Sequence, residues 1–339
     1  MATAKKLPSG NWNARAFYKD PITGKISRPS FSAGTKSEAL RKAHEWEAKK
    51  EQHTDTADLT VAEAIEQYIT LNTAAMSPST IKGYRVAQRN YFDQIGHRRV
   101  KDLNDADLQA YISDLCARYS PKTVRNAYSL LLPSLHMFTK RIYDVTLPAK
   151  VPKEYHIPTD AQVRELQRAA RPQMRKAIAL GAVGSLRLGE VCALRFQDID
   201  HDRCGIWVRH DMVQDENNEW ILKDMPKNAT SYRFIPMPPT VIQMLGEGEP
   251  DAFIYPHTPN ALSRAFRRLC ERSDMTYTFH DLRRFAISRM HALGVPDQYI
   301  QERSGHKTDS CLKAVYRLTI SDQSQKFADL ANEHFGTLF

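Results

Sequence analysis

The chain has 339 residues, enough for two or three domains, and its 42% hydrophobic and 26% charged content is typical of a globular protein. No apolar run approaches the length of a membrane span, and the N-terminus lacks the apolar core of a signal peptide. Five scattered cysteines without a CxxC pair favour a reducing cytoplasm and argue against a disulfide framework and a zinc site, and twelve histidines without an HExxH motif give no support to metal chemistry.

The positive charge is concentrated near the N-terminus. Of the net charge of +9, residues 1–50 contribute +7, through eleven Lys and Arg against four Asp and Glu. A compact basic segment of this kind is typical of nucleic-acid binding. The alternative is a basic tail that aids solubility, but this segment is patterned and is not a plain lysine run.

Residues 1–52 are expected to form the first domain. Polar and bulky residues alternate after Trp12, the turn signature DPITGK interrupts them, and the pattern resumes at Ile26. The helix formers of KSEALRKAHEWEAKKEQ follow, with apolar residues at helical spacing. We therefore predict a small three-stranded sheet backed by one helix, followed by a short linker.

Residues 58–150 are expected to form a second, helical and basic domain. Thr60 and Glu63 have the spacing of a capping box, and two later helices both begin with Ser-Pro-x-Thr. The positive end of a helix dipole, together with nearby lysines, favours contacts to phosphate. The residues that we expect to make such contacts are Lys82, Arg85, Lys122, Thr123 and Arg125.

Residues 155–339 are expected to form a third, larger domain after the proline-rich linker LPAKVPKEYHIP. The pattern is mostly helical, but residues 205–237 are rich in strand formers and predict a β-hairpin. The whole chain is therefore predicted to be mainly α with small β elements, in the α+β class.

The stretch HDLRRFAISRM in the third domain predicts a helix with one cationic face. His280 and Arg283 are one helical turn apart, and Arg284 is adjacent. Clustered positive groups repel one another unless an anion or carboxylate lies among them, so this face needs a partner. The opposite face is expected to be buried, through Leu282, Phe285, Ala286 and Leu293.

Other polar residues of this domain have ordinary interpretations when they are considered singly. Arg187 and Glu190, in GSLRLGE, have the spacing of a surface ion pair, and Lys227 lies in a hairpin turn. His306 follows a glycine, and Tyr316, ten residues later, has the periodicity of a half-buried helical residue. Each of these patterns is weak evidence of function by itself.

Taken together and in order, these motifs resemble the catalytic set of the tyrosine recombinases, the phage-integrase family. The set would be Arg187, Lys227, His280, Arg283, His306 and Tyr316. The K-x-x-x-S-x-R spacing that ends at Arg233 favours Lys227 over Lys223. The resemblance covers about residues 157–330 at the level of motifs. It departs from many members at Arg284, where histidine is commoner.

The resemblance implies an enzyme, a site-specific DNA recombinase (integrase) that integrates or excises a mobile element or prophage. Strands would be cleaved and rejoined through a 3′-phosphotyrosyl intermediate and a Holliday junction. Tyr316 would be the nucleophile, Lys227 the general acid, and the two arginines and two histidines would hold the scissile phosphate. Glu190 would orient Arg187, and neither a metal ion nor another cofactor is expected.

The resemblance extends to the other domains and to the partners. The helical segment resembles the family's SAM-like core-binding domain, and the first domain resembles the arm-binding domain of integrases from phages and conjugative transposons. The implied partners are double-stranded DNA with core-type and arm-type sites, a homotetramer on DNA, a DNA-bending host factor and an excisionase, with no membrane and a nucleoid-associated location. In the first domain, the candidate DNA contacts are Arg15, Lys25 and Arg28.

Two other functions and one structural choice stay open. The chain could resolve chromosome or plasmid dimers with the same chemistry, or it could be a catalytically inactive DNA-binding regulator on the same scaffold. The six filled catalytic positions argue against the regulator, and the basic N-terminal domain argues against the dimer resolver. The apolar residues after Tyr316 could pack on their own domain or dock into a neighbouring protomer.

Overall fold

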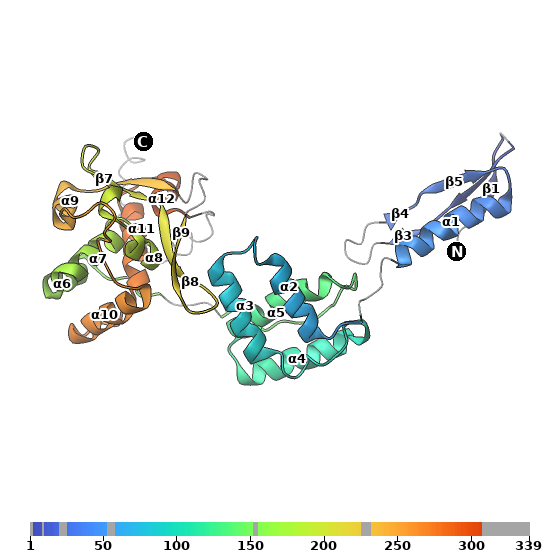
Figure 1. Cartoon of the computed structure of the whole chain (residues 1–339), viewed down its shortest axis with the longest axis horizontal. Helices are drawn as coiled ribbons and strands as arrows, with labels where there is room; N and C mark the ends of the chain where they lie inside the picture. Colours follow the sequence, from blue (N-terminus) through green and yellow to red (C-terminus); the bar gives the residue numbers. More distant parts are fainter. Residues whose placement is uncertain are drawn as a thin grey trace, which may run out of the picture. The chain divides into compact units, whose positions relative to one another are not determined.

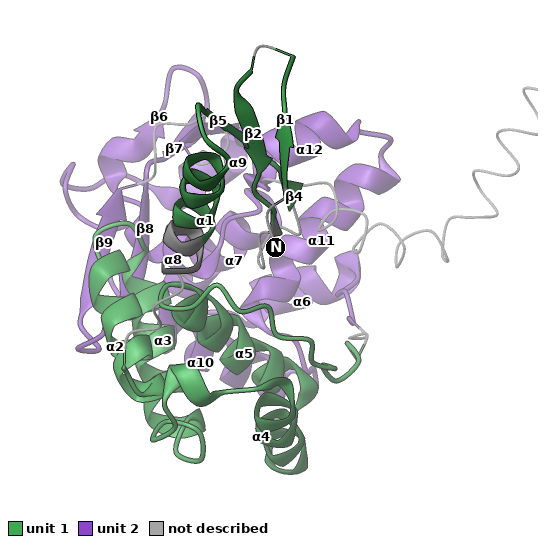
Figure 2. Cartoon of the chain, turned by 90° about the vertical axis from the view of Figure 1, so that its right-hand side faces the viewer, with its two compact units in different colours: residues 1–152 green, residues 153–339 purple. Residues whose placement is uncertain are grey.

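The computed structural model describes residues 3–8, 10–19, 26–52, 58–151, 155–224 and 232–306. The chain divides into two compact units, residues 1–152 and residues 153–339 (Figure 2). Helices dominate both, and the sheets are small and antiparallel, which confirms the predicted class. Within the described ranges, no helix combines the length and the apolar character needed to cross a membrane.

The N-terminal part of unit 1 is a small sheet with one helix against it (Figure 1). The strands β1 (Thr3–Lys6), β2 (Trp12–Arg15) and β5 (Ser30–Ala33) pair antiparallel in the order β1-β2-β5, and β3 (Tyr18–Lys19) pairs with β4 (Ile26–Ser27). Helix α1 (Lys36–Gln52) follows the sheet. Its buried Ala39 and Ala43 meet Ala14 and Ala33 of the strands. These small side chains let helix and sheet lie close together, as a three-stranded sheet backed by one helix predicts.

The rest of unit 1 is a helical bundle around one apolar core. Its elements are α2 (Val61–Asn72), α3 (Pro78–Tyr91), the 3₁₀ turn η1 (Val100–Asp102), α4 (Asp105–Arg118) and α5 (Pro121–His136). The capping box predicted at Thr60 and Glu63 is present, because each backbone N–H donates to the other's side chain. The Ser-Pro-x-Thr repeats begin α3 and α5, where Ser77 and Ser120 are the N-caps and proline occupies the first turn.

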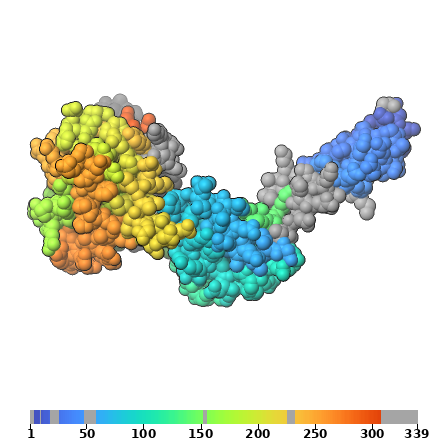
Figure 3. Space-filling model, viewed as in Figure 1, coloured from blue at the N-terminus to red at the C-terminus, as the bar shows by residue number. Residues whose placement is uncertain are grey.

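Unit 2 is mostly helical and contains the strand-rich interruption predicted for residues 205–237. Its helical elements are α6 (Asp160–Ala169), α7 (Pro172–Ala182), α8 (Leu188–Ala193), η2 (Phe196–Asp198), α9 (Pro239–Leu245), α10 (Pro259–Arg272), α11 (Phe279–Ala292) and α12 (Asp297–Ser304). The strands β6 (Ile199–Asp200), β7 (Gly205–Val208) and β10 (Arg233–Pro236) form an antiparallel sheet in the order β10-β7-β6. The hairpin of β8 (His210–Gln214) and β9 (Trp220–Asp224) forms part of the surface visible in Figure 3.

Close approaches between elements of unit 2 bring distant parts of the sequence together. A side chain at Gly181 of α7 would lie 3.1 Å from the ring of Phe279 on α11, so glycine lets these two helices pack tightly. A Cβ at Gly189 of α8 would lie 2.0 Å from the carboxylate of Asp211 on β8. The two glycines therefore allow α11 to pack closely against α7 and the hairpin to pack closely against α8.

The prediction of a buried apolar face on α11 is wrong for one residue. Leu282 and Ala286 are buried as expected, and Phe285 packs against the core with part of its surface exposed. Leu293, however, is 80% exposed. It follows the last residue of the helix, and Gly294, with φ of 77°, turns the chain away. The apolar pattern of the sequence therefore continues one residue beyond the end of the helix.

Candidate active site

Helix α11 begins where its sequence provides a cap. The backbone N–H and the hydroxyl of Thr278 both donate to the Asp281 carboxylate, each at 2.7 Å. This cap fixes the first turn, which carries His280 and Arg283. The three predicted cationic residues do not share one environment: His280 is exposed, Arg283 is 1% exposed, and Arg284 pairs with Asp281.

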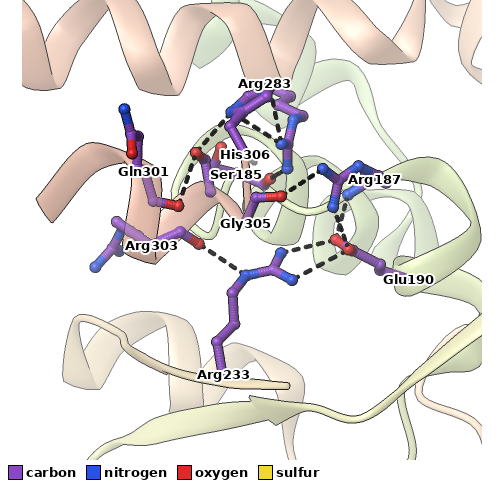
Figure 4. A network of polar contacts seen from close by, with 10 residues as sticks. Ser185, Arg187, Glu190, Arg233, Arg283, Gln301, Arg303, Gly305 and His306 are labelled. Carbon is purple, nitrogen blue, oxygen red and sulfur yellow. Dashed lines mark hydrogen bonds and ion pairs between the residues drawn. The ribbon is translucent and has the colours of Figure 1, made fainter. Parts of the chain in front are cut away.

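The buried Arg283 side chain joins α11 to two other segments (Figure 4). One of its terminal nitrogens donates to the carbonyl oxygen of Ser185, in the turn between α7 and α8. The other lies 3.2 Å from each ring nitrogen of His306. Ser185 has a φ of 57°, a left-handed conformation that is uncommon for a residue with a side chain. The unusual backbone of the Gly-Ser break thus places an acceptor for Arg283.

Glu190 connects two arginines on the other side of the site. Its carboxylate accepts from Nη1 of Arg187 at 2.8 Å and from both terminal nitrogens of Arg233 at 3.1 and 2.8 Å. Burial alone would raise the pKa of Glu190, but the charges of Arg233 and Arg187 and their hydrogen bonds lower this pKa to about 2. The carboxylate is therefore ionised, and it fixes both guanidinium groups.

The end of α12 is held by three arginines through backbone carbonyl groups. Arg187 donates to the Gly305 carbonyl at 2.8 Å, and Arg233 donates to the Arg303 carbonyl at 2.9 Å. Arg303 itself donates to the Val183 carbonyl at 3.0 Å. Gly305 ends the helix in the left-handed conformation, with φ of 69°. These contacts fix the position of His306, the residue that follows.

The two histidines are neutral at neutral pH. Desolvation, followed by the charges of Arg283 and Arg187, lowers the pKa of His306 to about 3. The pKa of His280 is lowered to about 4 by the protein atoms around it, which desolvate the imidazolium, and by the charges of Arg284 and Arg283. The ring of His280 nevertheless meets solvent. A neutral imidazole keeps one N–H donor, so both rings can donate a hydrogen bond to an anion.

Arg187, His280, Arg283 and His306 together form a positively charged, donor-rich cluster. A guanidinium has five N–H donors in a planar fork, and the contacts to protein described above use only some of them. The side chain of Arg187 stays 38% exposed and can reach a ligand. Two fixed guanidinium groups beside two neutral imidazoles suit the non-bridging oxygens of a phosphodiester. Among the described residues, no three His, Cys, Asp or Glu side chains come together to hold a metal ion.

The structure thus brings together Arg187, Glu190, His280, Arg283 and His306 from three separate sequence motifs. The predicted nucleophile Tyr316 and the predicted general acid Lys227 lie outside the described residues. The same holds for Lys25 of the N-terminal part.

The candidate phosphate contacts of the helical bundle have different environments. Arg85 is engaged by protein groups, because it donates to the carboxylate of Glu66 and, at 3.1 Å, to the amide oxygen of Gln88. Arg125 donates to the carbonyl of Pro148 at 2.8 Å. Lys122 is exposed.

The other candidate contacts of unit 1 stay near solvent. Lys82 is half-buried, and the backbone N–H of Thr123 donates to its N-cap Ser120 at 3.4 Å. On the N-terminal sheet, Arg15 is exposed, and exposed Arg28 lies over the ring of Phe17 at 5.5 Å.

Two residues that the sequence did not single out belong to this site. In the sequence, Arg233 only completes the spacing that favours Lys227, yet its side chain is 2% exposed and bound to Glu190. Its position in β10, two residues before the buried Ile235, placed it on the inward face of a strand, and this signal could have revealed its burial. Asp211 lies against Gly189, and desolvation and the charge of Glu190 raise its pKa to about 6. Nothing local in the sequence marks this approach.

Comparison with known families gives two matches. The profile described as "Phage integrase family" matches residues 159–319, and the profile described as "Phage integrase, N-terminal SAM-like domain" matches residues 62–148. Together they cover more than half of the chain and include every described residue of the site.

Two curated proteins are similar over nearly their whole lengths. A "Tyrosine recombinase XerC-like" protein of Caldanaerobacter subterraneus subsp. tengcongensis is 23% identical, over 95% of this chain and 97% of the relative. A "Prophage ps2 probable integrase" of Lactococcus lactis subsp. lactis is 21% identical, over 97% of this chain and 99% of the relative.

Solved structures share the fold. The Tn1549 transposon integrase in complex with transposon right end DNA superimposes with a TM-score of 0.67 at 19% identity, covering 80% of this chain and all of that one. The lambda integrase tetramer bound to a Holliday junction gives a TM-score of 0.57 at 16% identity, covering 92% of this chain and 94% of that one.

Proposed function

Because this chain belongs to the phage integrase family and is a tyrosine-type site-specific recombinase, we propose that it integrates and excises a mobile element or prophage. The observation that carries the proposal is that Arg187, Arg283 and His306 meet through hydrogen bonds between residues that lie far apart in the sequence. These donors are preorganised to bind one anion. An enzyme that cleaves a DNA strand without using ATP needs such donors at the scissile phosphate.

The proposed roles follow from the charge that develops in the reaction. Arg187 and Arg283 hold the non-bridging oxygens, and neutral His280 and His306 each donate one hydrogen bond. The donors bind the five-coordinate transition state more strongly than the ground-state diester, because negative charge grows on those oxygens. Glu190 acts through Arg187 and Arg233, whose positions it fixes.

The covalent step uses two residues assigned from the sequence alone. The phenolic oxygen of Tyr316 releases its proton to solvent and attacks phosphorus, the bond from phosphorus to the 5′-oxygen breaks, and Lys227 gives a proton to the leaving oxygen. The product is a 3′-phosphotyrosyl ester with a free 5′-hydroxyl. Because the ester keeps the energy of the broken bond, rejoining is the reverse reaction and needs no ATP. We propose that the arginines supply the charge that metal ions supply in other phosphoryl-transfer enzymes.

The domains and partners are proposed in the same terms. Residues 1–52 would bind arm-type DNA sites, residues 58–150 core-type sites, and residues 155–339 would carry out catalysis. The lambda integrase structure contains a tetramer on a Holliday junction, and we propose the same assembly for this chain. A DNA-bending host factor and an excisionase would set the direction of recombination, and the enzyme would act on the nucleoid in the cytoplasm.

A second candidate function has one observation in its favour. The XerC-like relative is similar over 95% of this chain, so a role in resolving chromosome or plasmid dimers uses the same residues. The N-terminal basic sheet distinguishes the two, because an integrase needs it for a second class of site. Changing both Arg15 and Arg28 to Ala should abolish a separate footprint on flanking DNA and leave core-site cleavage unchanged. Wild-type protein that leaves no such separate footprint would favour the dimer resolver, and a footprint that survives the change would remove Arg15 and Arg28 from the arm-binding surface.

Covalent capture tests the chemistry and identifies the cleaved sequence in the same experiment. A pool of duplexes, each nicked within a randomised segment, loses a short fragment after cleavage, so the protein–DNA adduct accumulates and the bound sequences can be read. Wild-type protein should yield adducts, and Tyr316→Phe should yield none while its DNA binding persists. Adducts from Tyr316→Phe would overturn the nucleophile, and none from wild type would favour the inactive regulator.

The proposed independence from metal ions has its own test. Adduct formation on the recovered duplex should proceed at the same rate in EDTA as in Mg²⁺, because the arginines neutralise the developing charge. A rate that falls in EDTA and returns with Mg²⁺ would contradict this part of the mechanism.

A further inference from the structure

The first residues of unit 2 lie along the helix that carries the HxxR motif. We name residues 155–160 the lead-in segment. Its residues contact α11 in the same order in which they occur: Tyr155 with Arg284, Ile157 with the cluster of Ile287 and Ile300, and Asp160 with Arg289. The exposed His156 lies between two contact residues, as expected for extended chain with alternate side chains turned inward.

Arg284 is the point where this segment meets the first turn of α11. Its guanidinium carbon lies 4.0 Å from the centre of the Tyr155 ring, and the same group pairs with the Asp281 carboxylate. The Arg284 and Asp281 side chains are 16% and 11% exposed, so water screens the contact weakly. Asp281 in turn accepts the two hydrogen bonds from Thr278 that cap the helix.

A chain of contacts therefore runs from the lead-in segment to the candidate site. The Tyr155 ring contacts the Arg284 guanidinium, which pairs with the Asp281 carboxylate. Asp281 in turn fixes the first turn of the helix, which carries His280 and Arg283. The position of Arg284 also explains which way its guanidinium group points. The guanidinium faces the ring and carboxylate of its own unit and is used there, whereas Arg283 faces His306.

We propose that Tyr155 and Arg284 are positioning residues, which fasten the lead-in segment to the first turn of α11 and so keep His280 and Arg283 in the geometry that strand cleavage needs. The inference rests on the proposed recombinase function. It assigns to Arg284 a role through other residues, with no contact to DNA. The charge of Arg284 also helps to keep His280 neutral, because it is a named cause of the lowered pKa of that ring.

The variants separate the ring, the charge and the general cost of a mutation. Tyr155→Leu removes the π-face, Tyr155→Trp keeps it, and Arg284→Gln removes the cation. Arg195→Gln is a matched control, because Arg195 also lies over an aromatic ring, Phe253 at 5.4 Å, and pairs with an aspartate, but lies away from the lead-in segment.

The cleavage rate is measured on the recovered duplex at saturating DNA, with affinity measured separately. Tyr155→Leu and Arg284→Gln should each lower the rate about ten-fold at unchanged affinity, and the double variant should be no slower, because both remove one contact. Tyr155→Trp and Arg195→Gln should stay within about two-fold of wild type. Effects that multiply in the double variant, or a wild-type rate for Tyr155→Leu, would overturn the proposal.

Two readouts without DNA keep this test separate from the proposed function. Hydrogen exchange at residues 155–158 and in the first turn of α11 should speed up in Tyr155→Leu and Arg284→Gln and stay unchanged in Arg195→Gln. The pKa of His280, followed by NMR, should rise in Arg284→Gln, since the cation beside it is lost, and should not move in Arg195→Gln. Absence of adducts from wild type would sink the proposed function alone, whereas unchanged exchange and an unmoved His280 would sink this inference.

Discussion

Arginine has different surroundings in the two units. In unit 2, Arg233 and Arg283 are 4% and 1% exposed, and their acceptors are the buried Glu190 and the buried turn at Ser185. In the helical bundle of unit 1, Arg85 is half-buried and pairs with a Glu66 side chain that is 49% exposed. Arg233 and Arg85 both have carboxylate partners, but only the pair in unit 2 is removed from water.

The difference in burial predicts a difference in energy and in availability. A surface ion pair contributes about 0–1 kcal/mol and weakens with salt, whereas breaking a buried pair costs about 3–5 kcal/mol because the remaining charge has no solvent. A buried guanidinium is therefore committed to one geometry. A surface guanidinium can leave its carboxylate for another anion at little cost, so it can serve as a DNA contact.

Glu190→Gln should give the largest effect. The neutral amide leaves Arg233 buried without its counter-charge, so we expect the free energy of unfolding to fall by about 3 kcal/mol at pH 7. The folded-state pKa of Glu190, about 2, lies below the ordinary value of 4.5. Its contribution is therefore complete above pH 4.5 and is lost as the pH falls towards 2. Urea unfolding of wild type and variant across this range measures both quantities.

The expected pH dependence also provides the control. The difference between Glu190→Gln and wild type should shrink as the pH falls below 4.5, because the wild-type carboxyl group is then increasingly neutral as well. If the free energy of unfolding falls by less than about 1 kcal/mol at pH 7, the pair of Glu190 and Arg233 contributes no more than a surface pair. The difference in energy between the two units would then not exist.

The sequence predicted those parts of the molecule that depend on near neighbours. The caps at Thr60, Ser77 and Ser120 and the strands between residues 205 and 237 all follow from local patterns. The pairing of Arg233 with Glu190 spans 43 positions, and its bond to the Arg303 carbonyl spans 70. No periodicity encodes such distances, because they depend on how α8, β10 and α12 pack.

The residues of the candidate site were predicted more completely than the residues that hold them in position. Order and spacing of short motifs identified Arg187, His280, Arg283 and His306, and the structure brings these residues together. The use of Arg284 could not be inferred in this way, because its aromatic partner lies in a linker with no regular pattern. A helical wheel places Arg284 on the same face as Arg283, but different partners direct the two guanidinium groups apart.

Asp211→Asn sharpens the comparison from the opposite side and should have an intermediate effect. The charged and titratable groups around Asp211 are Arg187, Glu190, Cys192, Lys223 and Arg233. Desolvation is the largest cause of the shift in the pKa of Asp211. Because its pKa is raised to about 6, the ionised carboxylate destabilises the folded state, fully above pH 6 and less as the pH falls towards 3.8.

The amide should therefore stabilise the fold by about 1 kcal/mol at pH 7, a value reduced for the partial solvent access of this residue. The gain should be small at pH 4, where the Asp211 carboxyl group is neutral in the folded state and the pH is close to its ordinary pKa of 3.8. Thermal unfolding at pH 7.5 and pH 4 measures it. A variant less stable than wild type at pH 7.5 would mean that Asp211 is as well compensated as Glu190.

Glu66→Gln should have the smallest effect on stability, and its main effect should be on DNA binding. Its carboxyl pKa is lowered, chiefly by the hydrogen bond from Arg85 and then by Gln88, but the group is largely solvated, so the free energy of unfolding should fall by less than about 1 kcal/mol.

If Arg85 also contacts a DNA phosphate, the Glu66 carboxylate competes with the phosphate. Removing its charge should then tighten binding and increase the salt dependence by about one phosphate contact. Asp114→Asn is the matched control, because it removes the surface carboxylate that pairs with Arg118, which is not a predicted DNA contact. Equal changes in the two variants would reflect net charge alone and would remove Arg85 from the DNA-binding surface.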